Sequence, residues 1–393
     1  MKTMNWAMTK LGITIVMVLV LVFITACGNN NEEAASNDNT ANAKNTASSD
    51  ATGPGTGGKA VGFIFVGAKD DYGYNQAGYI GSEAVEKAFP DYKILRSENV
   101  PETAEAERVM EEMIRNGAKI IFPTSYGHLD PALNVAKRHP DVLFFHQGGL
   151  KTADNLGTYF GTIWEPVYLA GIAAGKMSKS GKLGYIVSIP IPQVLLNVNA
   201  FELGAKSVNP DATTTVVFTG SWCDPGQQAN AANSMIDQGI DVLTQHQDCT
   251  KTVIETAERR GVMSVGYHAD ASELAPKGWV VGSIWNWPAL FVDMVKVASE
   301  GKFDGSKYVG QFRGTMAEDI VQLTGFGTEV PEDVKKLIEQ KKAEMAAGIM
   351  HPFKGPIKDQ SGAIKIEEGV SPEITALESI DYLVEGVIGS IPK

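Results

Sequence analysis

Several short loops of the chain carry aromatic and hydrogen-bonding side chains in a combination that suits binding of a flat polar solute. An aromatic ring can stack on a planar solute, while a carboxylate or an amide hydrogen-bonds to the solute's edge. The loops that follow predicted strands supply the candidate ligand-binding residues Asp71, Tyr74, Asn75, Tyr126, Trp222, Asp248, Trp285 and Asn286.

The same loops offer no arrangement that is typical of catalysis. The sequence has no Gly-x-Ser-x-Gly elbow, no His-Glu-x-x-His and no Walker A loop. Gly175-Lys176 and Gly181-Lys182 are followed by Met177 and Leu183, which cannot bind magnesium. The loop carboxylates also lack an evident nucleophile partner, so the sequence favours a binding protein without a cofactor over an enzyme.

Two His-x-Asp pairs raise the alternative of a metal site. His246-x-Asp248 and His268-x-Asp270 follow successive predicted strands, and two imidazoles with two carboxylates could converge on a metal ion. Nothing else in the sequence supports such a site, because loop histidines more often cap backbone groups or lie on the surface. We therefore predict no metal.

Short β-rich apolar segments alternate with segments of helical period, which is typical of parallel sheets covered by helices. One series runs from strand 61–66 and helix 76–89 to strand 142–146, and a similar series runs from strand 183–188 to strand 263–267. In such sheets ligands bind beyond the carboxyl ends of the strands, where the candidate residues lie. The predicted fold class is α/β, with two Rossmann-like lobes joined by several crossovers.

The chain is expected to cross between the lobes near residues 160–165, 282–288 and 308–325. Lobe 1 would then comprise residues 59–161 plus about 285–310. Lobe 2 would comprise residues 162–284 plus about 311–393. Hinge motion about these crossings would close the lobes on a solute.

The first 58 residues predict export and lipid anchoring. Lys2 and Lys10 precede an apolar run over residues 11–26, which is shorter than the roughly 20 residues of a membrane span and suits a signal-peptide core. The run ends in Ile24-Thr25-Ala26-Cys27-Gly28, which resembles a bacterial lipobox. Residues 1–26 are thus predicted to be a lipoprotein signal peptide, with an acylated Cys27 holding the chain to the lipid bilayer. The alternative is an accidental Cys at the end of a membrane anchor.

Residues 27–58 consist almost entirely of small and polar residues and predict a lipid-anchored flexible tether. The predicted location is therefore the extracytoplasmic face of the cell membrane. The whole chain has 34 Lys and Arg against 46 Asp and Glu, a net charge of −12, which argues against a nucleic-acid partner held by phosphate contacts.

Cys223 and Cys249 both follow strands of the second lobe, and an oxidising exterior would allow a disulfide between them. With a strand order 2-1-3 their strands are separated by one strand, so the loops would have to lean together to bring the Cα atoms within about 7 Å. The alternative is a pair of buried, inert thiols.

Over essentially all of residues 60–390 the chain resembles the basic membrane protein family, substrate-binding lipoproteins of ABC importers whose best understood members are purine nucleoside receptors. The stretches that carry the resemblance are Val61-Gly62-Phe63-Ile64, Asp71-Tyr72-Gly73-Tyr74-Asn75-Gln76, Tyr159-Phe160-Gly161, Tyr168-Leu169-Ala170-Gly171, Pro190-Ile191-Pro192, Asn199-Ala200-Phe201, Trp222 with Asp224-Pro225, and Ile284-Trp285-Asn286-Trp287.

The resemblance implies that Tyr74 stacks on a purine and that Asp71 and Asn75 hydrogen-bond to its edge. Asp248 matches a position of the family that can bind ribose hydroxyls. Nucleoside-binding members carry a Lys near the position where this chain has Trp285-Asn286-Trp287. Loss of a cation directed at the sugar favours a bare nucleobase, or another small aromatic solute, over a nucleoside.

The resemblance therefore implies a lipid-anchored solute-binding protein that captures a purine nucleobase or nucleoside between two lobes and delivers it to an ABC permease. The alternative is a ligand-sensing surface lipoprotein without a transport role. A cytoplasmic repressor is disfavoured, because a lipobox stands where a DNA-binding helix-turn-helix would be.

Overall fold

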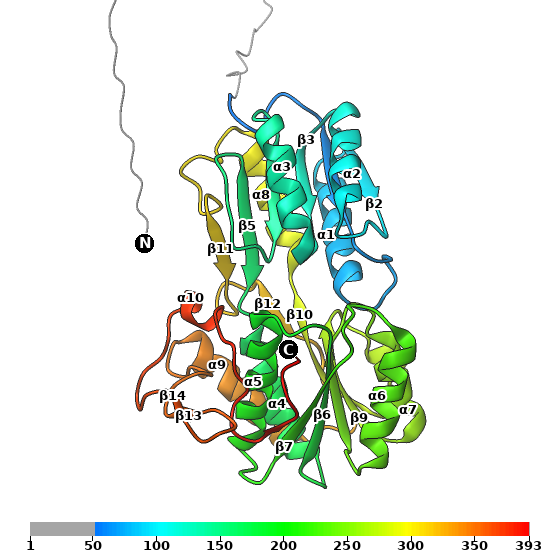
Figure 1. The fold of residues 1–393 in the computed structure, drawn as a ribbon, viewed down its shortest axis with the longest axis vertical. Coiled ribbons are helices and arrows are strands. Elements are labelled where there is room, and N and C mark those ends of the chain that lie inside the picture. Colours follow the sequence, from blue (N-terminus) through cyan, green and yellow to red (C-terminus); the bar gives the residue numbers. More distant parts are fainter. Residues whose placement is uncertain (1–51, 393) are drawn as a thin grey trace, which may run out of the picture. The chain divides into compact units, whose positions relative to one another are not determined.

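Two sheets, each covered by helices on both faces, organise the chain (Figure 1). The structure is a computed structural model that describes residues 52–392. The predicted signal peptide, Cys27 and most of the predicted tether lie outside the described residues. None of the helices within residues 52–392 is long and apolar enough to cross a bilayer.

The sheet of lobe 1 has six strands in the order β11-β5-β4-β3-β1-β2, all paired in parallel. They are β1 (Ala60–Ile64), β2 (Lys93–Ser97), β3 (Ala118–Pro123), β4 (Leu143–Gln147), β5 (Leu156–Gly161) and β11 (Gln311–Gly314). The helices are α1 (Tyr74–Ala88), α2 (Ala104–Arg115), α3 (Leu129–Arg138) and α8 (Trp287–Ser299), with a short 3₁₀ turn η1 (Tyr126–His128).

Alternation of side chains along β1 explains how this sheet is covered on both faces. Phe63 packs with Val85 of α1 and Phe291 of α8 in one apolar cluster. The next residue, Ile64, packs with Met110 of α2 and helix α3 in another. Buried parallel strands of this kind have apolar residues on both faces, which is why the sequence shows continuous apolar runs there.

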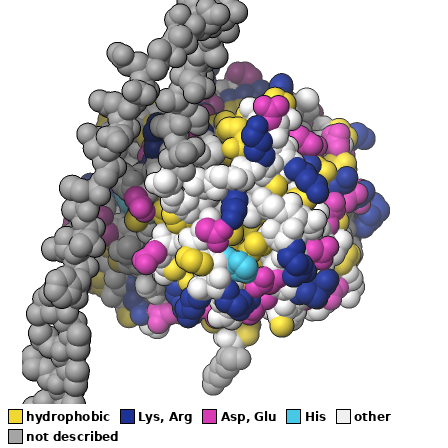
Figure 2. All heavy atoms as spheres, turned by 90° about the horizontal axis from the view of Figure 1, so that it is seen from above, with side chains coloured by type: hydrophobic (Ala, Val, Ile, Leu, Met, Phe, Trp, Pro, Cys, Tyr) yellow, Lys and Arg dark blue, Asp and Glu magenta, His cyan; other side chains and the backbone are white. Residues whose placement is uncertain are grey.

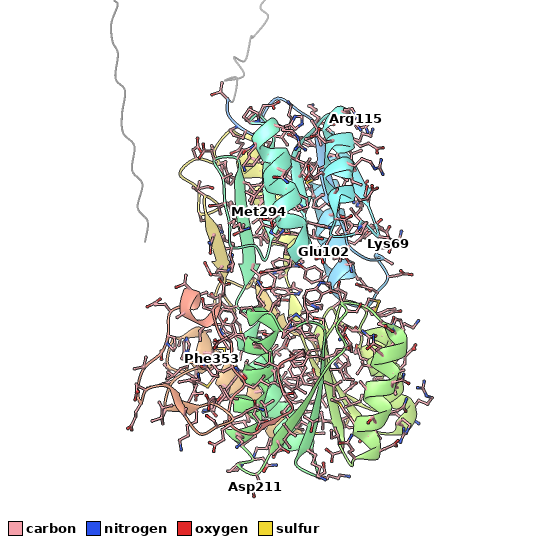
Figure 3. The ribbon with its side chains drawn as sticks, in the orientation of Figure 1. Lys69, Glu102, Arg115, Asp211, Met294 and Phe353 are labelled. Carbon is pink, nitrogen blue, oxygen red and sulfur yellow. A yellow bond between two sulfur atoms is a disulfide. The ribbon has the colours of Figure 1, made fainter. Side chains whose placement is uncertain are left out.

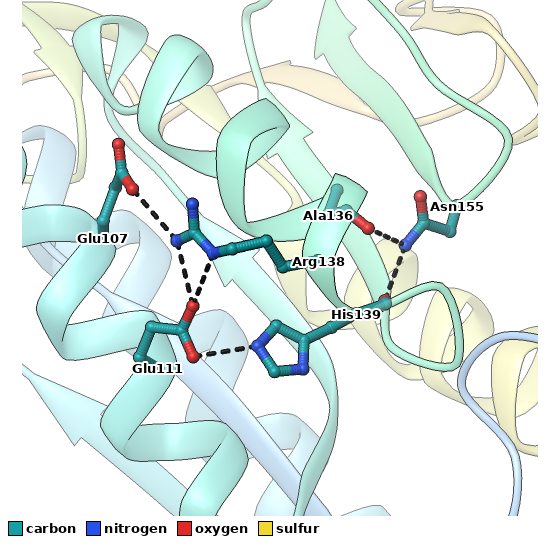
Figure 4. A network of polar contacts seen from close by, with 6 residues as sticks. All are labelled: Glu107, Glu111, Ala136, Arg138, His139 and Asn155. Carbon is teal, nitrogen blue, oxygen red and sulfur yellow. Dashed lines mark hydrogen bonds and ion pairs between the residues drawn. The ribbon is translucent and has the colours of Figure 1, made fainter.

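Polar contacts hold the two outer helices of lobe 1 together (Figure 4). Arg138, at the end of α3, donates to Glu111 at 2.9 Å and to Glu107 at 3.0 Å, both on α2. His139 Nε2 lies 2.8 Å from the other oxygen of Glu111. The Asn155 amide donates to the carbonyl oxygens of Ala136 and His139 and thereby ties the end of α3 to the loop before β5.

The sheet of lobe 2 has seven strands in the order β12-β10-β9-β8-β6-β7-β15. They are β6 (Lys182–Val187), β7 (Thr213–Phe218), β8 (Val242–His246), β9 (Met263–His268), β10 (Trp279–Trp285), β12 (Val321–Leu323) and β15 (Val387–Ile388). Only β12 is antiparallel to its neighbour, β10, within this sheet.

Helices α4 (Trp164–Met177) and α5 (Pro192–Lys206) cover one face of this sheet, and α6 (Pro225–Asp237) and α7 (Lys251–Arg260) cover the other. Two glycines let the backbones of α4 and α5 touch. A Cβ added at Gly171 would lie 2.2 Å from the Phe201 carbonyl oxygen, and one at Gly204 would lie 2.1 Å from that of Tyr168. Any larger residue at either position would force this helix pair apart.

Lobe 2 also contains a short 3₁₀ turn, η2 (Ser272–Leu274), after β9. Its C-terminal elements are α9 (Glu332–Ala346), β13 (Ile357–Lys358), β14 (Ile364–Ile366) and α10 (Ile374–Leu377). Figure 3 labels Phe353 among these elements and Met294 within lobe 1, and neither side chain is exposed. At the end of lobe 1 distant from lobe 2, Figure 2 shows Lys and Arg interspersed with Asp and Glu.

The fold class predicted from the sequence is confirmed, and most boundaries lie within two residues of the expected ones. Helix α5 begins at Pro192, because Pro is favoured in the first helical turn, where its missing N–H costs no hydrogen bond.

Two predicted boundaries need correction. Strand β11 pairs with β5, so the return into lobe 1 extends to Gly314, beyond the expected end near residue 310. The last residues of the predicted tether are not free of the domain. Gly55 N donates to the Asp141 carbonyl at 3.1 Å, and Gly55 is buried against Leu143 and Ala298.

Within the described residues the chain passes three times between the two sheets, after β5, after β10 and after β11. These crossings lie side by side. Thr162 N donates to Gly314 O at 2.8 Å, Asn286 N donates to Ile320 O at 2.9 Å, and Met316 N donates to the Glu165 carboxylate at 2.7 Å.

Candidate ligand-binding site

A cavity of about 340 Å³, including space open to solvent, lies between the lobes at the carboxyl ends of strands from both sheets. Lobe 1 contributes Tyr74, Ser125, Tyr126 and Phe160 to its lining, and lobe 2 contributes Gln193, Trp222, His246, Asp248 and His268. Aromatic rings thus line the cavity from both sides. The lining contains one carboxylate and neither Lys nor Arg, so it suits an uncharged solute better than an anion.

Four of the eight residues predicted from the sequence line this cavity: Tyr74, Tyr126, Trp222 and Asp248. The Tyr74 hydroxyl donates to the Thr124 carbonyl at 2.5 Å, and its ring meets His268 edge-on at 5.0 Å between centroids. The Trp222 ring lies 6.2 Å from the His246 ring. These contacts fix two of the rings before any solute enters.

Asp248 is the acceptor of the cavity. The residue is 6 % exposed, and it supplies the one carboxylate of the cavity lining. Burial is the largest cause that raises the pKa of Asp248 well above its ordinary value, and the nearby carboxylates of Asp71 and Glu102 raise it further. The Asn75 amide acts in the opposite direction and lowers the pKa of Asp248. The Nδ2 atom of this amide donates to Asp71 at 2.8 Å.

The loops that carry Trp222 and Asp248 are joined to each other. Asp248 N donates to the Trp222 carbonyl at 2.8 Å. The residues that follow them, Cys223 and Cys249, form a disulfide with a Cα–Cα distance of 5.3 Å. Although their strands β7 and β8 are separated by β6, the loops lean together as such a bond requires.

Asp71 and Asn75 do not line the cavity, in contrast to the role that the resemblance implied. The Asp71 carboxylate accepts from the backbone N–H groups of Gly73, Asn75 and Gln76 at 2.8–3.0 Å and from the Asn75 amide at 2.8 Å. The side-chain Oδ1 atom of Asn75 accepts from Gly67 N at 3.0 Å. Both side chains are therefore occupied in shaping the loop before α1, and that loop positions Tyr74.

Trp285 and Asn286 also lie outside the cavity lining. The Trp285 ring stacks on Trp287 with centroids 4.6 Å apart and packs against Phe160 at 4.7 Å, so it supports the cavity from behind. The Asn286 amide donates to the backbone and side chain of Asp319, at 3.0 and 3.2 Å, in the crossing segments.

His246 and His268 are lining residues that the sequence interpretation did not choose. Burial lowers the pKa of His246 to about 3, and burial together with His246 lowers the pKa of His268 well below its ordinary value, so both rings are neutral near pH 7. Their position at the ends of β8 and β9 was the available signal. Among the residues that the structure describes, no group of three His, Cys, Asp or Glu is arranged to hold a metal ion.

The lobes touch at the rim of the cavity. Tyr74 N donates to the Asp248 carbonyl at 3.2 Å, and Thr250 donates from its N–H to Asp71 O at 3.1 Å and from its hydroxyl to Tyr72 O at 2.5 Å. Gly73 permits this approach, because a Cβ there would lie 1.8 Å from the Asp248 carbonyl oxygen. The structure thus has its lobes closed over the cavity.

Rings from two lobes, one buried carboxylate and crossings that lie side by side define a two-lobed solute-binding protein. The chain belongs to the ABC transporter substrate-binding protein PnrA-like family, called Bmp, whose family model matches residues 59–353. Substrate-binding proteins of ABC transporters bind small solutes and deliver them to a permease. This family is one of solute-binding proteins.

Two relatives are similar over most of the chain. A purine-binding protein of Brucella abortus is 39 % identical over 334 residues, which cover 85 % of this chain and 94 % of the relative. A protein of Haloferax volcanii, whose name proposes glucose binding in an ABC transporter, is 30 % identical over 331 residues, 84 % of this chain and 81 % of the relative.

A solved structure shares the fold. The solute-binding protein of an ABC transporter system from Aeropyrum pernix superposes with a TM-score of 0.64 at 18 % identity. The superposition covers 81 % of this chain and 95 % of that structure.

Proposed function

We propose that this protein binds a purine, with a nucleobase favoured over a nucleoside, and delivers it to an ABC importer. The observation that carries the proposal is the cavity itself: aromatic rings from both lobes surround a single buried carboxylate, with no cation in the lining. A purine has flat faces for the rings and N–H groups for Asp248.

The charge of the cavity lining favours a base over a nucleoside. The lining contains no Lys, so it lacks a group that would hold a sugar.

Isothermal titration calorimetry of the purified protein, refolded to remove carried-over ligand, tests the proposal. The panel comprises purine bases, their nucleosides, glucose and amino acids. We expect a purine base to bind, and Asp248→Asn to weaken that binding by about 10-fold or more, because the substitution replaces an acceptor oxygen with an N–H donor. The matched control is Asp211→Asn, an exposed carboxylate at the far end of lobe 2 (Figure 3).

The outcomes separate the solute classes. Binding of nucleosides alone would keep the purine site and overturn the preference for a base. Binding of glucose or amino acids alone would overturn the purine proposal. Glucose belongs in the panel because the name of the Haloferax relative proposes glucose binding.

We also propose that an acylated Cys27 holds the protein to the extracytoplasmic face of the cell membrane. The lipobox-like Ile24-Thr25-Ala26-Cys27-Gly28 supports this proposal. Cell fractionation is the test. We expect the protein in the membrane fraction and Cys27→Ala outside it, whereas retention of the variant in the membrane would point to a proteinaceous anchor.

A further inference from the structure

His268 is a cavity residue with one nitrogen bonded and one nitrogen unpartnered. Its Nδ1 atom lies 2.9 Å from the indole Nε1 of Trp285. Its Nε2 atom has no hydrogen-bond partner within residues 52–392, although the side chain is only 2 % exposed. The ring lines the cavity, and its backbone has a φ of 74°, a left-handed conformation that non-glycine residues adopt mainly where the surrounding structure imposes it.

The contact with Trp285 determines which nitrogen of His268 carries the proton. An indole N–H can only donate, so the His268 Nδ1 atom must be the acceptor and must be unprotonated. A neutral imidazole then carries its proton on Nε2. Burial keeps the ring neutral, because it lowers the pKa of His268 well below the ordinary value.

Trp285 cannot readily turn away from this contact. Its ring lies between Trp287, stacked at 4.6 Å with an interplanar angle of 11°, and Phe160 at 4.7 Å. The next residue, Asn286, is bonded through its backbone and its amide to the segment over residues 319–320. The indole N–H is therefore a fixed donor aimed at His268.

We propose that Trp285 is a positioning residue that holds His268 in its Nε2–H form, and that His268 is a specificity-determining donor requiring a hydrogen-bond acceptor on the ligand. This inference rests on the proposed purine site and deepens it. Lobe 2 then presents one fixed donor, His268, and one acceptor, Asp248. A matching ligand has a ring nitrogen or carbonyl oxygen for the first and an N–H group for the second.

A fixed donor discriminates among purines more than among sugars. A sugar hydroxyl can donate or accept, so it adapts to either form of His268. A purine ring nitrogen without hydrogen can only accept, and replacement of that nitrogen by C–H leaves the buried Nε2–H without a partner, which is costly.

The first test is the protonation of His268 in the full chain without ligand. Nitrogen-15 NMR of histidine-labelled protein, with the His268 signal identified by its loss in His268→Gln, distinguishes the two neutral forms. We expect the Nε2–H form in the wild type and a mixture in Trp285→Phe, which keeps a ring but loses the N–H. The matched control is Trp279→Phe, which removes an indole N–H at the other end of β10, where it donates to the Gly325 carbonyl at 3.3 Å.

The second test is calorimetry with adenine, hypoxanthine and their deaza analogues, each of which has one ring nitrogen replaced by C–H. We expect one analogue to bind the wild type about 10-fold or more weakly, and His268→Phe to bind that analogue and the parent base equally. Trp285→Phe should weaken the parent base, whereas Trp279→Phe should not.

A wild-type His268 protonated on Nδ1, or a Trp285→Phe variant with unchanged protonation and affinity, would overturn the inference. Equal affinity of the wild type for every deaza analogue would overturn the role of His268 in specificity. If no purine binds the wild type, the proposed function fails, and the NMR result alone still decides whether Trp285 fixes His268.

Discussion

Substitution of Gly73 by Ala tests whether closure of the lobes contributes to affinity. Gly73 lies in the loop before α1, and its Cβ would meet the Asp248 carbonyl oxygen of the other lobe at 1.8 Å and a Thr250 methyl at 3.1 Å. The backbone φ of −147° lies outside the left-handed region, so Ala meets no strain of that kind. The clash exists only when the lobes are closed.

The magnitude follows from the contacts that the clash would break. Three hydrogen bonds join the lobes here, from Tyr74 N to Asp248 and from the N–H and hydroxyl of Thr250 to Asp71 and Tyr72. Each contributes about 1 kcal/mol net. Loss of one to all three should weaken solute binding by about 1–3 kcal/mol, or roughly 5–150-fold.

The assay combines calorimetry with small-angle X-ray scattering. We expect Gly73→Ala to lose affinity and to lose the compaction that solute causes in the wild type, while its unfolding midpoint without solute stays close to that of the wild type. Gly325→Ala is the matched control, because an added Cβ there has no neighbour within 4 Å. Wild-type affinity together with wild-type compaction in Gly73→Ala would refute the role of this contact.

Two further predictions concern lobe 2. Paired Cys223→Ser and Cys249→Ser substitutions should weaken solute binding by about 3–10-fold, since the loops of Trp222 and Asp248 would lose their covalent link; unchanged affinity would show that the backbone contact suffices. Burial raises the pKa of Glu202 from 4.5 to about 7, so folding favours its protonated form and the free energy of unfolding falls as pH rises through this window. At about 1.4 kcal/mol per pKa unit the loss is roughly 3 kcal/mol. In urea unfolding, the free energy of unfolding of Glu202→Gln should rise relative to that of the wild type between about pH 5 and pH 8. A difference that stays constant over this range would contradict the assignment.

The sequence predicted the fold well because buried parallel strands leave a strong pattern. The run Leu183-Gly184-Tyr185-Ile186-Val187 is uncharged and buried in β6, and β6 ends at Val187, one residue before the expected end of that strand. The segment at residues 311–314 is harder to place, because Gln311-Phe312-Arg313-Gly314 is short and alternates apolar and polar residues. Only its pairing with β5 assigns it to lobe 1.

The site was predictable in position and less so in detail. Tyr74 and Asp248 lie in the cavity as expected, since loops after parallel strands converge at one edge. Asp71 was assigned to the ligand, but a carboxylate three residues before the first residue of a helix can equally accept from the free N–H groups of that helix. A sequence does not say which donors such a carboxylate will meet. His268 was set aside because its role depends on a contact with Trp285, seventeen residues along the chain.

The three crossings that lie side by side limit how the lobes can move relative to each other. Two bodies joined at one point can rotate in any direction, whereas bodies joined along a line can easily rotate only about that line. The hydrogen bonds from Thr162 to Gly314 and from Asn286 to Ile320 hold the crossings in such an array. Twisting and sliding would break these bonds, so opening is reduced to one degree of freedom. Each closure should then return the two halves of the cavity to the same register, without a search over other relative orientations.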